Sequence, residues 1–361
     1  MTLFSRQWVL LVRCAGVRQK GSFLMLPDVF RKKIPIILVG VGTLFVAVLG
    51  GCSQQHLART DYVKGAIAES QGKMTQALKE LNAAIKINSG MVLAYEARGD
   101  IFRKKGDYHR AASNYKTATR LNPLSFHSWY WLGVSYQQLR RFALAIQSYQ
   151  HALTIHPKSA RASMNIAVSY AQNGNPFLGL IYAQRAMMNG ADSFDALANL
   201  GVIYAQCARE DPKFRALAIK NFRSSLELQP RQPAIYLNLA QMYMAGNRYG
   251  EAARVLRTGQ KICPTPLLSE RLGYCYYRTR QYEKAIDSYK LALKQNPVYV
   301  PALNGLGAAY EASAIDGAAH GRALRVKAIQ QWHKSLSIDP NQPLIRGLVR
   351  RFAVPVPAAS N

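Results

Sequence analysis

The sequence has few cysteines and few acidic residues. Only five cysteines occur among 361 residues, too few for a disulfide framework. We therefore expect Cys207, Cys263 and Cys275 to pack as small apolar residues. Only 19 Asp and Glu residues stand against 47 Lys and Arg residues, so the formal net charge is +28.

The excess of positive charge has two interpretations. It favours an acidic partner, an anionic membrane or nucleic acid. However, no block of five like charges occurs. Basic residues spread over a solvated surface would explain the same net charge, and both interpretations stand at this point.

Catalytic and metal-binding motifs are also missing. The chain has no Walker-type glycine loop, no H-E-x-x-H, no paired CxxC and no G-x-S-x-G. His151 and His156 are five residues apart, so a helix would point them to different faces. The apolar period is helical throughout, which argues against the strands of a nucleotide-binding unit. The sequence therefore predicts no enzyme, catalytic residue, metal, cofactor or small-molecule substrate.

What the sequence does contain is a repeated pattern, clearest over residues 126–159. The small residues Gly133 and Ala145 would let two helices approach closely, and Pro157 cannot continue the second helix. Within each helix, a spacing of three or four residues puts the matching side chains on one face. The matching residues are Trp129, Leu132, Gly133, Tyr136, Ala145, Tyr149, Ala152 and Pro157.

This pattern resembles the tetratricopeptide repeat (TPR), W-x2-L-G-x2-Y, then A-x3-F/Y, then P, with a period of about 34 residues. Prolines 123 and 157 are 34 residues apart, as are prolines 230 and 264. The resemblance implies an all-α, right-handed superhelical TPR solenoid of about eight helix-turn-helix repeats plus a C-terminal capping helix.

Two repeats are longer than this period. The fifth has about five extra residues within 207–215, and the eighth has about nine within 312–325. Both insertions fall between the two helices of their repeats, where we expect extended helices or a protruding loop. Because loop length costs little entropy, deleting either insertion should leave the array folded.

The N-terminal region has the features of an export signal. Basic residues at 31–33 precede an apolar run at 34–51, which is typical of a secretory signal. The sequence Leu49-Gly50-Gly51-Cys52 resembles a bacterial lipobox, and this implies that Cys52 is lipid-modified and becomes the new N-terminus. The alternative is an uncleaved membrane anchor at 34–51, at the short limit for a span.

These features predict an order of segments along the chain. Signals usually start close to their basic region, so we expect the true start at Met25. The expected segments are 1–24, a start extension or unstructured segment; 25–51, the signal peptide or membrane segment; 52–57, the lipidated N-terminus and a short linker; 58–340, the TPR array; 341–353, the capping helix; and 354–361, a disordered tail.

Side-chain amides recur at one register of the predicted first helices. Asn165, Asn199 and Asn238 occupy one position in consecutive repeats. Trp131 takes this position one repeat earlier. A second row lies seven residues further along the helices, at Gln138, Gln172 and Gln206.

This arrangement resembles the asparagine ladder in the TPR groove of O-linked N-acetylglucosamine transferase. The resemblance implies that the amides bind the backbone of an extended peptide. A carboxamide offers one acceptor and two donors, which match a peptide unit. We expect Tyr130, Trp131 and Arg271 to tune the ends of the bound segment. The alternative is that these polar residues simply face water.

The predicted function is a non-enzymatic scaffold lipoprotein that faces the periplasm or the cell exterior. It would be anchored to the membrane through Cys52 and would bind a protein or peptide in its concave groove. One alternative is a binder of nucleic acid or another polyanion, although predicted export argues against nucleic acid. Another is an accessory subunit of an enzyme complex.

Overall fold

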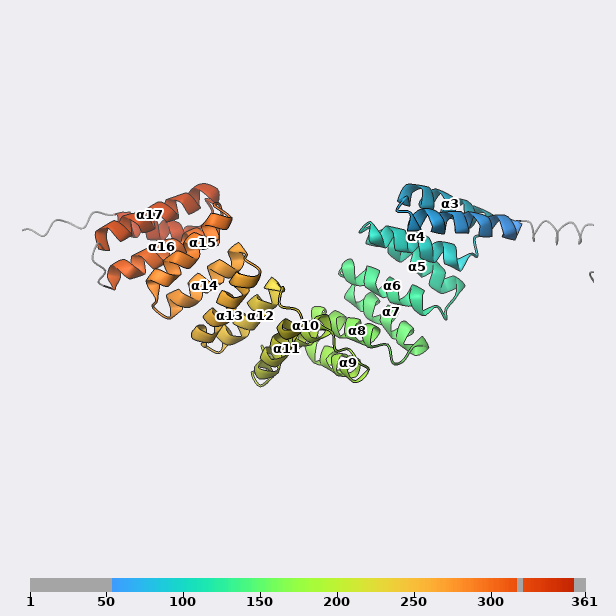
Figure 1. Cartoon of the computed structure of the whole chain (residues 1–361), viewed down its shortest axis with the longest axis horizontal. Coiled ribbons are helices and arrows are strands. Elements are labelled where there is room, and N and C mark those ends of the chain that lie inside the picture. Colours follow the sequence, from blue (N-terminus) through green and yellow to red (C-terminus); the bar gives the residue numbers. More distant parts are fainter. Residues whose placement is uncertain (1–53, 317–320, 354–361) are drawn as a thin grey trace, which may run out of the picture. The chain divides into compact units, whose positions relative to one another are not determined.

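The computed structural model describes residues 54–316 and 321–353 (Figure 1). Within these residues all regular secondary structure is helical. The chain divides into two compact units, Met1–Ser89 and Gly90–Asn361. The predicted all-α fold is therefore confirmed.

The first unit contains one helix pair among its described residues. Residues 54–70 are helical, and α3 spans Met74–Ile87. A Cβ atom on Gly65 would lie 2.9 Å from Cγ of the fully buried Leu81. The two helices therefore touch at a glycine, as the small-residue pattern predicts.

The second unit consists of seven helix pairs and a final helix among its described residues. Each helix contacts the next one in the chain, and the first helix of each pair also contacts the first helix of the next pair. We call the surface formed by these first helices the first-helix face. The pairs are α4 (Val92–Lys104) with α5 (Tyr108–Leu121), α6 (Phe126–Gln138) with α7 (Phe142–Ile155), α8 (Ala160–Gln172) with α9 (Pro176–Met188), α10 (Phe194–Cys207) with α11 (Phe214–Leu228), α12 (Pro233–Ala245) with α13 (Tyr249–Ile262), α14 (Pro266–Arg278) with α15 (Tyr282–Gln295), and α16 (Val300–Ile315) with α17 (Gly321–Ile338).

Within the pairs, glycines on the first helices receive aromatic rings from the second helices. A Cβ atom on Gly133 would lie 2.6 Å from the ring of Tyr149, and one on Gly201 would lie 2.7 Å from the ring of Phe222. Both rings are fully buried. A larger residue at either glycine would force the helices apart, which explains the small residue in the pattern.

Turns of three residues join the helices in five of the seven pairs, for example 105–107 and 173–175. In each of these turns one residue has a positive φ. In two turns this residue is a glycine, Gly106 with a φ of 76° and Gly174 with a φ of 85°. In the turn between α6 and α7 it is Arg140, with a φ of 57°. A side chain in this conformation carries a steric cost that glycine avoids.

The two insertions take different forms. The fifth repeat has a six-residue connection, 208–213, between α10 and α11. In the eighth repeat the insertion largely lengthens the helices, since α16 has 16 residues and α17 has 18. Residues of the first insertion line a hollow on the surface.

The helix α18 (Pro343–Ala353) packs on α17 as the predicted cap. The ring of Phe352 stacks on that of Trp332 with 5.9 Å between the ring centroids. Val349 is also buried there. The apolar side of the short helix therefore covers the end of the last pair, as a terminal repeat requires.

Several predictions concern residues outside the described part of the chain. They are the segments 1–24 and 25–51, the lipidation site Cys52, and the tail 354–361. Between residues 54 and 353, apart from 317–320, no helix is both long enough and apolar enough to cross a membrane. The cysteines at 207, 263 and 275 are all free, and Cys207 and Cys275 are buried.

Candidate functional site

The three asparagines occupy equivalent places on the first-helix face. Asn165, Asn199 and Asn238 are each the sixth residue of α8, α10 and α12, and all three are half-buried. Nδ2 of Asn165 donates a hydrogen bond of 3.1 Å to the hydroxyl of Tyr130. The carboxamides of Asn199 and Asn238 form no hydrogen bond with any described residue. Two of the three amides are therefore free to bind a ligand.

The second predicted row lies within one surface hollow. Gln138, Gln172 and Gln206 line a depression of about 470 Å³ together with Ala171 and Arg140. Gln138 and Gln172 are exposed, whereas Oε1 of Gln206 is buried and accepts no hydrogen bond from the described residues. A buried acceptor without a donor is costly, so this orientation of the Gln206 side chain is unfavourable.

The residues predicted to tune the ends have unequal exposure. Tyr130 is only 7% exposed and packs in the core, so it lies behind Asn165 and not at the surface. Trp131 is half-buried, with the guanidinium carbon of Arg103 3.8 Å from its ring centroid. Arg271 is exposed and lies 3.4 Å from the carboxylate of Glu270. Of the three, Arg271 is the most accessible to a partner.

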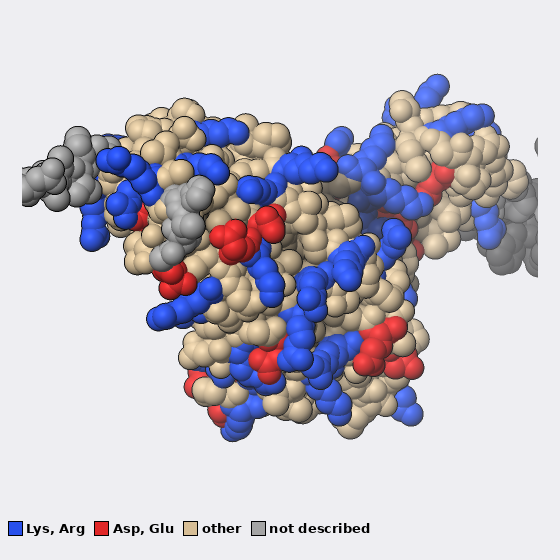
Figure 2. All heavy atoms as spheres, turned by 60° about the vertical axis from the view of Figure 1, so that its left-hand side comes forward, with Lys and Arg blue, Asp and Glu red and all other residues tan. Residues whose placement is uncertain are grey.

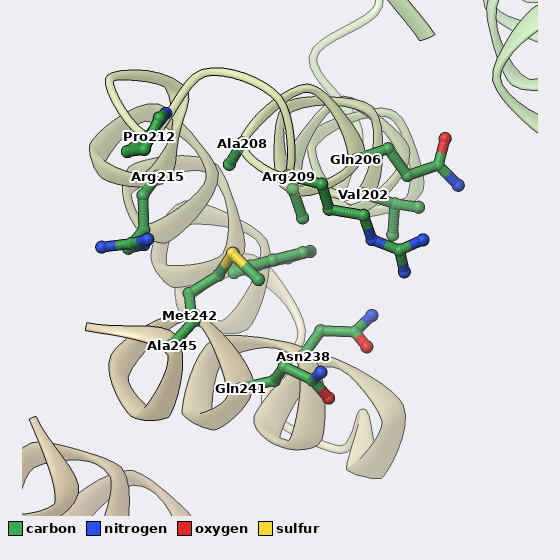
Figure 3. A pocket seen from close by; sticks show the side chains of 12 residues that line it. Val202, Gln206, Ala208, Arg209, Pro212, Arg215, Asn238, Gln241, Met242 and Ala245 are labelled. Atoms are coloured by element: carbon green, nitrogen blue, oxygen red, sulfur yellow. The ribbon is translucent and has the colours of Figure 1, made fainter. Parts of the chain in front are cut away.

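Asn238 and Gln206 also line a second, larger hollow of about 510 Å³ between α10, α11 and α12 (Figure 3). Its polar side chains include Arg209, Arg215 and Gln241. Its remaining lining is apolar and consists of Val202, Ala205, Ala208, Pro212, Phe222, Met242 and Ala245. A ligand with both an apolar group and an anionic group would match this lining.

The first-helix face is different on α4 and α6, where charged groups contact one another. Nε2 of His127 lies 3.4 Å from Oδ2 of Asp100, and Nδ1 lies 3.8 Å from Oε1 of Glu96. Asp100 also accepts a hydrogen bond of 2.7 Å from the hydroxyl of Tyr115. Glu96 accepts hydrogen bonds from Ser125 and Ser128. We call these six residues the acidic cluster.

The pKa values in this cluster follow from the contacts. The hydrogen bonds with Asp100 and Glu96 outweigh burial and raise the pKa of His127 to about 9. Burial raises the pKa of Glu96 and of Asp100, but the hydrogen bonds from His127 and the neighbouring hydroxyls outweigh it, so both pKa values are lowered. The cluster therefore holds two carboxylates and an imidazolium at neutral pH.

The geometry of the acidic cluster supports a structural role. It joins the first helices of two successive pairs, and its polar groups satisfy one another. Within residues 54–316 and 321–353, no group of three His, Cys, Asp or Glu side chains is arranged to hold a metal ion. The cluster therefore stabilises the contact between α4 and α6.

Basic side chains are spread over the surface. Figure 2 shows Lys and Arg distributed across the visible face, with Asp and Glu in small separate groups. Several of the described cations lie over tyrosine rings, as Arg278 does at 4.4 Å from the ring centroid of Tyr249. This distribution is consistent with a solvated basic surface.

The predicted site omitted Arg209, Arg215 and Gln241, which line the larger hollow. Two signals in the sequence could have indicated them. Arg209 and Arg215 belong to the insertion at 207–215, and Gln241 follows Asn238 by one helical turn. The hollow itself could not be predicted, because it depends on how α10, α11 and α12 and the inserted residues pack together.

Comparisons with known proteins agree with the helix pairs. Two family models, both described as tetratricopeptide repeat, match the chain, one at residues 96–160, 135–196 and 214–265 and the other at 267–297. A search of curated proteins gives no significant match. Together the two models cover just over half of the chain, taking the overlapping matches once.

Solved structures show the same fold at low sequence identity. The C-terminal part of a TPR repeat-containing protein from Cytophaga hutchinsonii has a TM-score of 0.55 and 19% identity, covering 68% of this chain and 99% of that one. PilW, a type IV pilus biogenesis factor, has a TM-score of 0.51 and 20% identity, covering 58% and 94%. At these identities the similarity establishes the fold alone.

Proposed function

Because this chain belongs to the tetratricopeptide repeat family, whose members are generally protein-interaction scaffolds, we propose that it binds an extended polypeptide along its amide-lined first-helix face. The binding residues would be Asn165, Asn199 and Asn238, with Gln138, Gln172 and Gln206 as the second row. The partner's backbone, and not one particular side chain, would be recognised.

The observation that supports this most is the lack of internal partners for these amides. The side-chain amides of Asn199, Asn238 and Gln172 form no hydrogen bond with any described residue, and these residues belong to first helices that contact one another. A peptide unit offers one donor and one acceptor, and a carboxamide can match both. Each such hydrogen bond contributes only about 0.5–1.5 kcal/mol net, so several must act together.

The test is a triple substitution of Asn165, Asn199 and Asn238 to alanine. The probe is a synthetic peptide of alternating Ser and Thr, acetylated and amidated so that its ends carry no charge. Loss of three hydrogen bonds should weaken its binding about tenfold or more, with helical content unchanged. The affinity is measured by titration with the labelled peptide.

A matched control replaces three exposed amides of second helices, Gln147, Gln184 and Gln295, by alanine. This control should bind the peptide as the natural chain does. If the folded asparagine variant binds as well as this control, the amide-lined face is not the peptide site.

We also propose that the chain is a cell-envelope lipoprotein anchored through Cys52, as the lipobox resemblance implies. Cys52→Ala should then abolish incorporation of labelled fatty acid and leave an unprocessed precursor. A mature protein that starts at another residue would contradict the proposal. Full membrane retention of the variant would instead favour an anchor at residues 34–51.

The net charge of +28 supports a polyanion as the second candidate ligand. Binding measurements with a short RNA and with the neutral peptide distinguish a polyanion from a peptide backbone as the ligand. RNA binding by ion pairs should fall steeply with added salt, whereas binding of a neutral backbone should change little. Binding of RNA alone, with a steep salt dependence, would favour the polyanion.

A further inference from the structure

The hollow between α10, α11 and α12 owes its shape to the insertion of the fifth repeat. The connection between these helices has six residues, 208–213, where five other pairs of the second unit have three. Ala208, Arg209 and Pro212 of this connection line the hollow, and so does Arg215 at the start of α11. The five pairs that are joined by three-residue turns have no counterpart to these inserted residues.

Two arginines of the hollow have no acidic partner. The guanidinium groups of Arg209 and Arg215 form no ion pair and no hydrogen bond with a described residue. The nearby Asp211 is already paired with Lys213 at 2.5 Å. Figure 3 shows the two arginines on opposite sides of Met242. The hollow therefore offers positive charge on both sides of an apolar surface.

The half-buried Arg215 is held in place by packing. Its Nη1 atom lies 3.4 Å from the position that a Cβ atom on Gly246 would take, so it packs against the end of α12. A half-buried cation without a counterion gains more from an incoming carboxylate than an exposed cation does. This site therefore favours an anionic ligand.

The apolar lining and the amides indicate what accompanies the charge. The volume of about 510 Å³ lies within the range of roughly 300–1,000 Å³ that is typical of ligand pockets. Met242 and the buried Phe222 provide apolar contact. Gln206 and Asn238 belong both to this hollow and to the amide rows. A chain lying along the amides would pass directly over it.

We infer that this hollow receives an apolar side chain of the partner polypeptide, flanked on both sides by carboxylates that pair with Arg209 and Arg215. The inference rests on the proposed function and gives it a sequence preference. In an extended chain, side chains two residues apart face the same way, so the recognised pattern is acidic-x-apolar-x-acidic. The acidic residues lie within the chain, and a free C-terminus is not required.

The experiment compares three blocked peptides on the same Ser/Thr backbone. Their centres are Glu-Ser-Leu-Ser-Glu, Glu-Ser-Ala-Ser-Glu and Lys-Ser-Leu-Ser-Lys. The first should bind about tenfold more tightly than either of the others, since it alone has both the apolar group and the carboxylates. Added salt should reduce its advantage over Lys-Ser-Leu-Ser-Lys, which comes from ion pairs, but not its advantage over Glu-Ser-Ala-Ser-Glu, which is apolar.

A charge-removing variant assigns the preference to the hollow. In Arg209→Gln/Arg215→Gln, the preference for Glu-Ser-Leu-Ser-Glu over Lys-Ser-Leu-Ser-Lys should disappear. The control Lys220→Gln/Arg231→Gln removes the same charge from exposed positions outside the hollow and should keep the preference. In a second variant, Ala245→Trp would fill the apolar part from its exposed rim and should remove the preference for leucine over alanine.

The outcomes separate this inference from the proposed function. Equal affinities of the natural chain for all three peptides would overturn the inference and leave backbone binding intact. A preference that survives in the Arg209/Arg215 variant would also overturn it. If instead the amides do not bind the peptide backbone, the triple asparagine variant would bind every peptide as the natural chain does.

Discussion

The helices α4 and α6 have the same place in the fold as α8, α10 and α12, but their polar groups have different partners. On α4 and α6, Glu96, Asp100 and His127 contact one another, and Arg103 lies over Trp131. On α10 and α12, the side-chain amides of Asn199 and Asn238 have no hydrogen-bond partner among the described residues. The first helices of successive pairs thus use their polar side chains for internal contacts in one region and leave side-chain amides available in the other.

This difference shows how one repeat can have two uses. Polar groups that satisfy each other stabilise the stacking of helices, and removing one leaves its partner unpaired. Polar groups without partners add little to stability but retain their capacity to bind a ligand. The comparison therefore predicts large stability effects on α4 and α6 and binding effects on α8 to α12.

The largest expected effect is that of Asp100→Ala. It removes the acceptor of the Tyr115 hydroxyl and the closest carboxylate to His127. We expect the free energy of unfolding to fall by about 2–3 kcal/mol. Urea unfolding measures it, and Asn199→Ala is the matched control, with an expected change within about 0.5 kcal/mol. Similar losses in the two variants would contradict the comparison.

The second prediction concerns pH. The pKa of His127 is about 9 in the folded chain and close to 6.5 when unfolded, so its stabilisation is complete below pH 6.5 and is lost as the pH rises through 9. The pKa values of Glu96 and Asp100 are lowered, so their stabilisation is lost on acidification. Unfolding curves between pH 6 and 10 should show the alkaline loss, and His127→Gln should remove it.

The third prediction, with a smaller effect, concerns a substitution that extends the amide row to α6. Trp131 occupies the register of the asparagines, so Trp131→Asn adds one amide. One further hydrogen bond should tighten binding of the neutral peptide by about 0.5–1.5 kcal/mol. Trp131→Ala is the control and should give no gain. An equal affinity of both variants would show that this position does not contact the peptide.

The smallest expected effect concerns the turn between α6 and α7. Arg140 has a φ of 57°, where the next turn has Gly174. Arg140→Gly removes the steric cost of this conformation but increases the freedom of the unfolded chain, so we expect a gain of about 0.5 kcal/mol. Thermal unfolding would measure the gain. A loss of stability would mean that the arginine side chain makes a net favourable contribution.

The helix pairs could be predicted because their pattern reflects local physics. Gly133 and Tyr149 match the repeat, and the structure shows the ring lying directly on the glycine. The capping helix was equally predictable from its apolar side, which places Phe352 on Trp332. In both cases the spacing of residues along a helix determines the contact.

The contacts between repeats could not be read from the sequence. The pairing of His127 with Glu96 and Asp100 depends on the distance between α4 and α6, which no spacing within one helix determines. Similarly, the register of Asn165 predicted its helix face but not its hydrogen bond to Tyr130. The register of the asparagines therefore predicted the helix face on which they lie. Only the structure shows which of their amides have no internal hydrogen-bond partner.

The central claim is that the amides bind a peptide backbone, and a double-mutant cycle tests it most directly. One partner of the cycle is the triple asparagine variant, and the other is a peptide whose central backbone N–H groups carry methyl groups. The account predicts that methylation weakens binding to the natural chain but not to the variant, with a coupling of about 0.5–1.5 kcal/mol for each hydrogen bond. Equal effects of methylation on both proteins would contradict it.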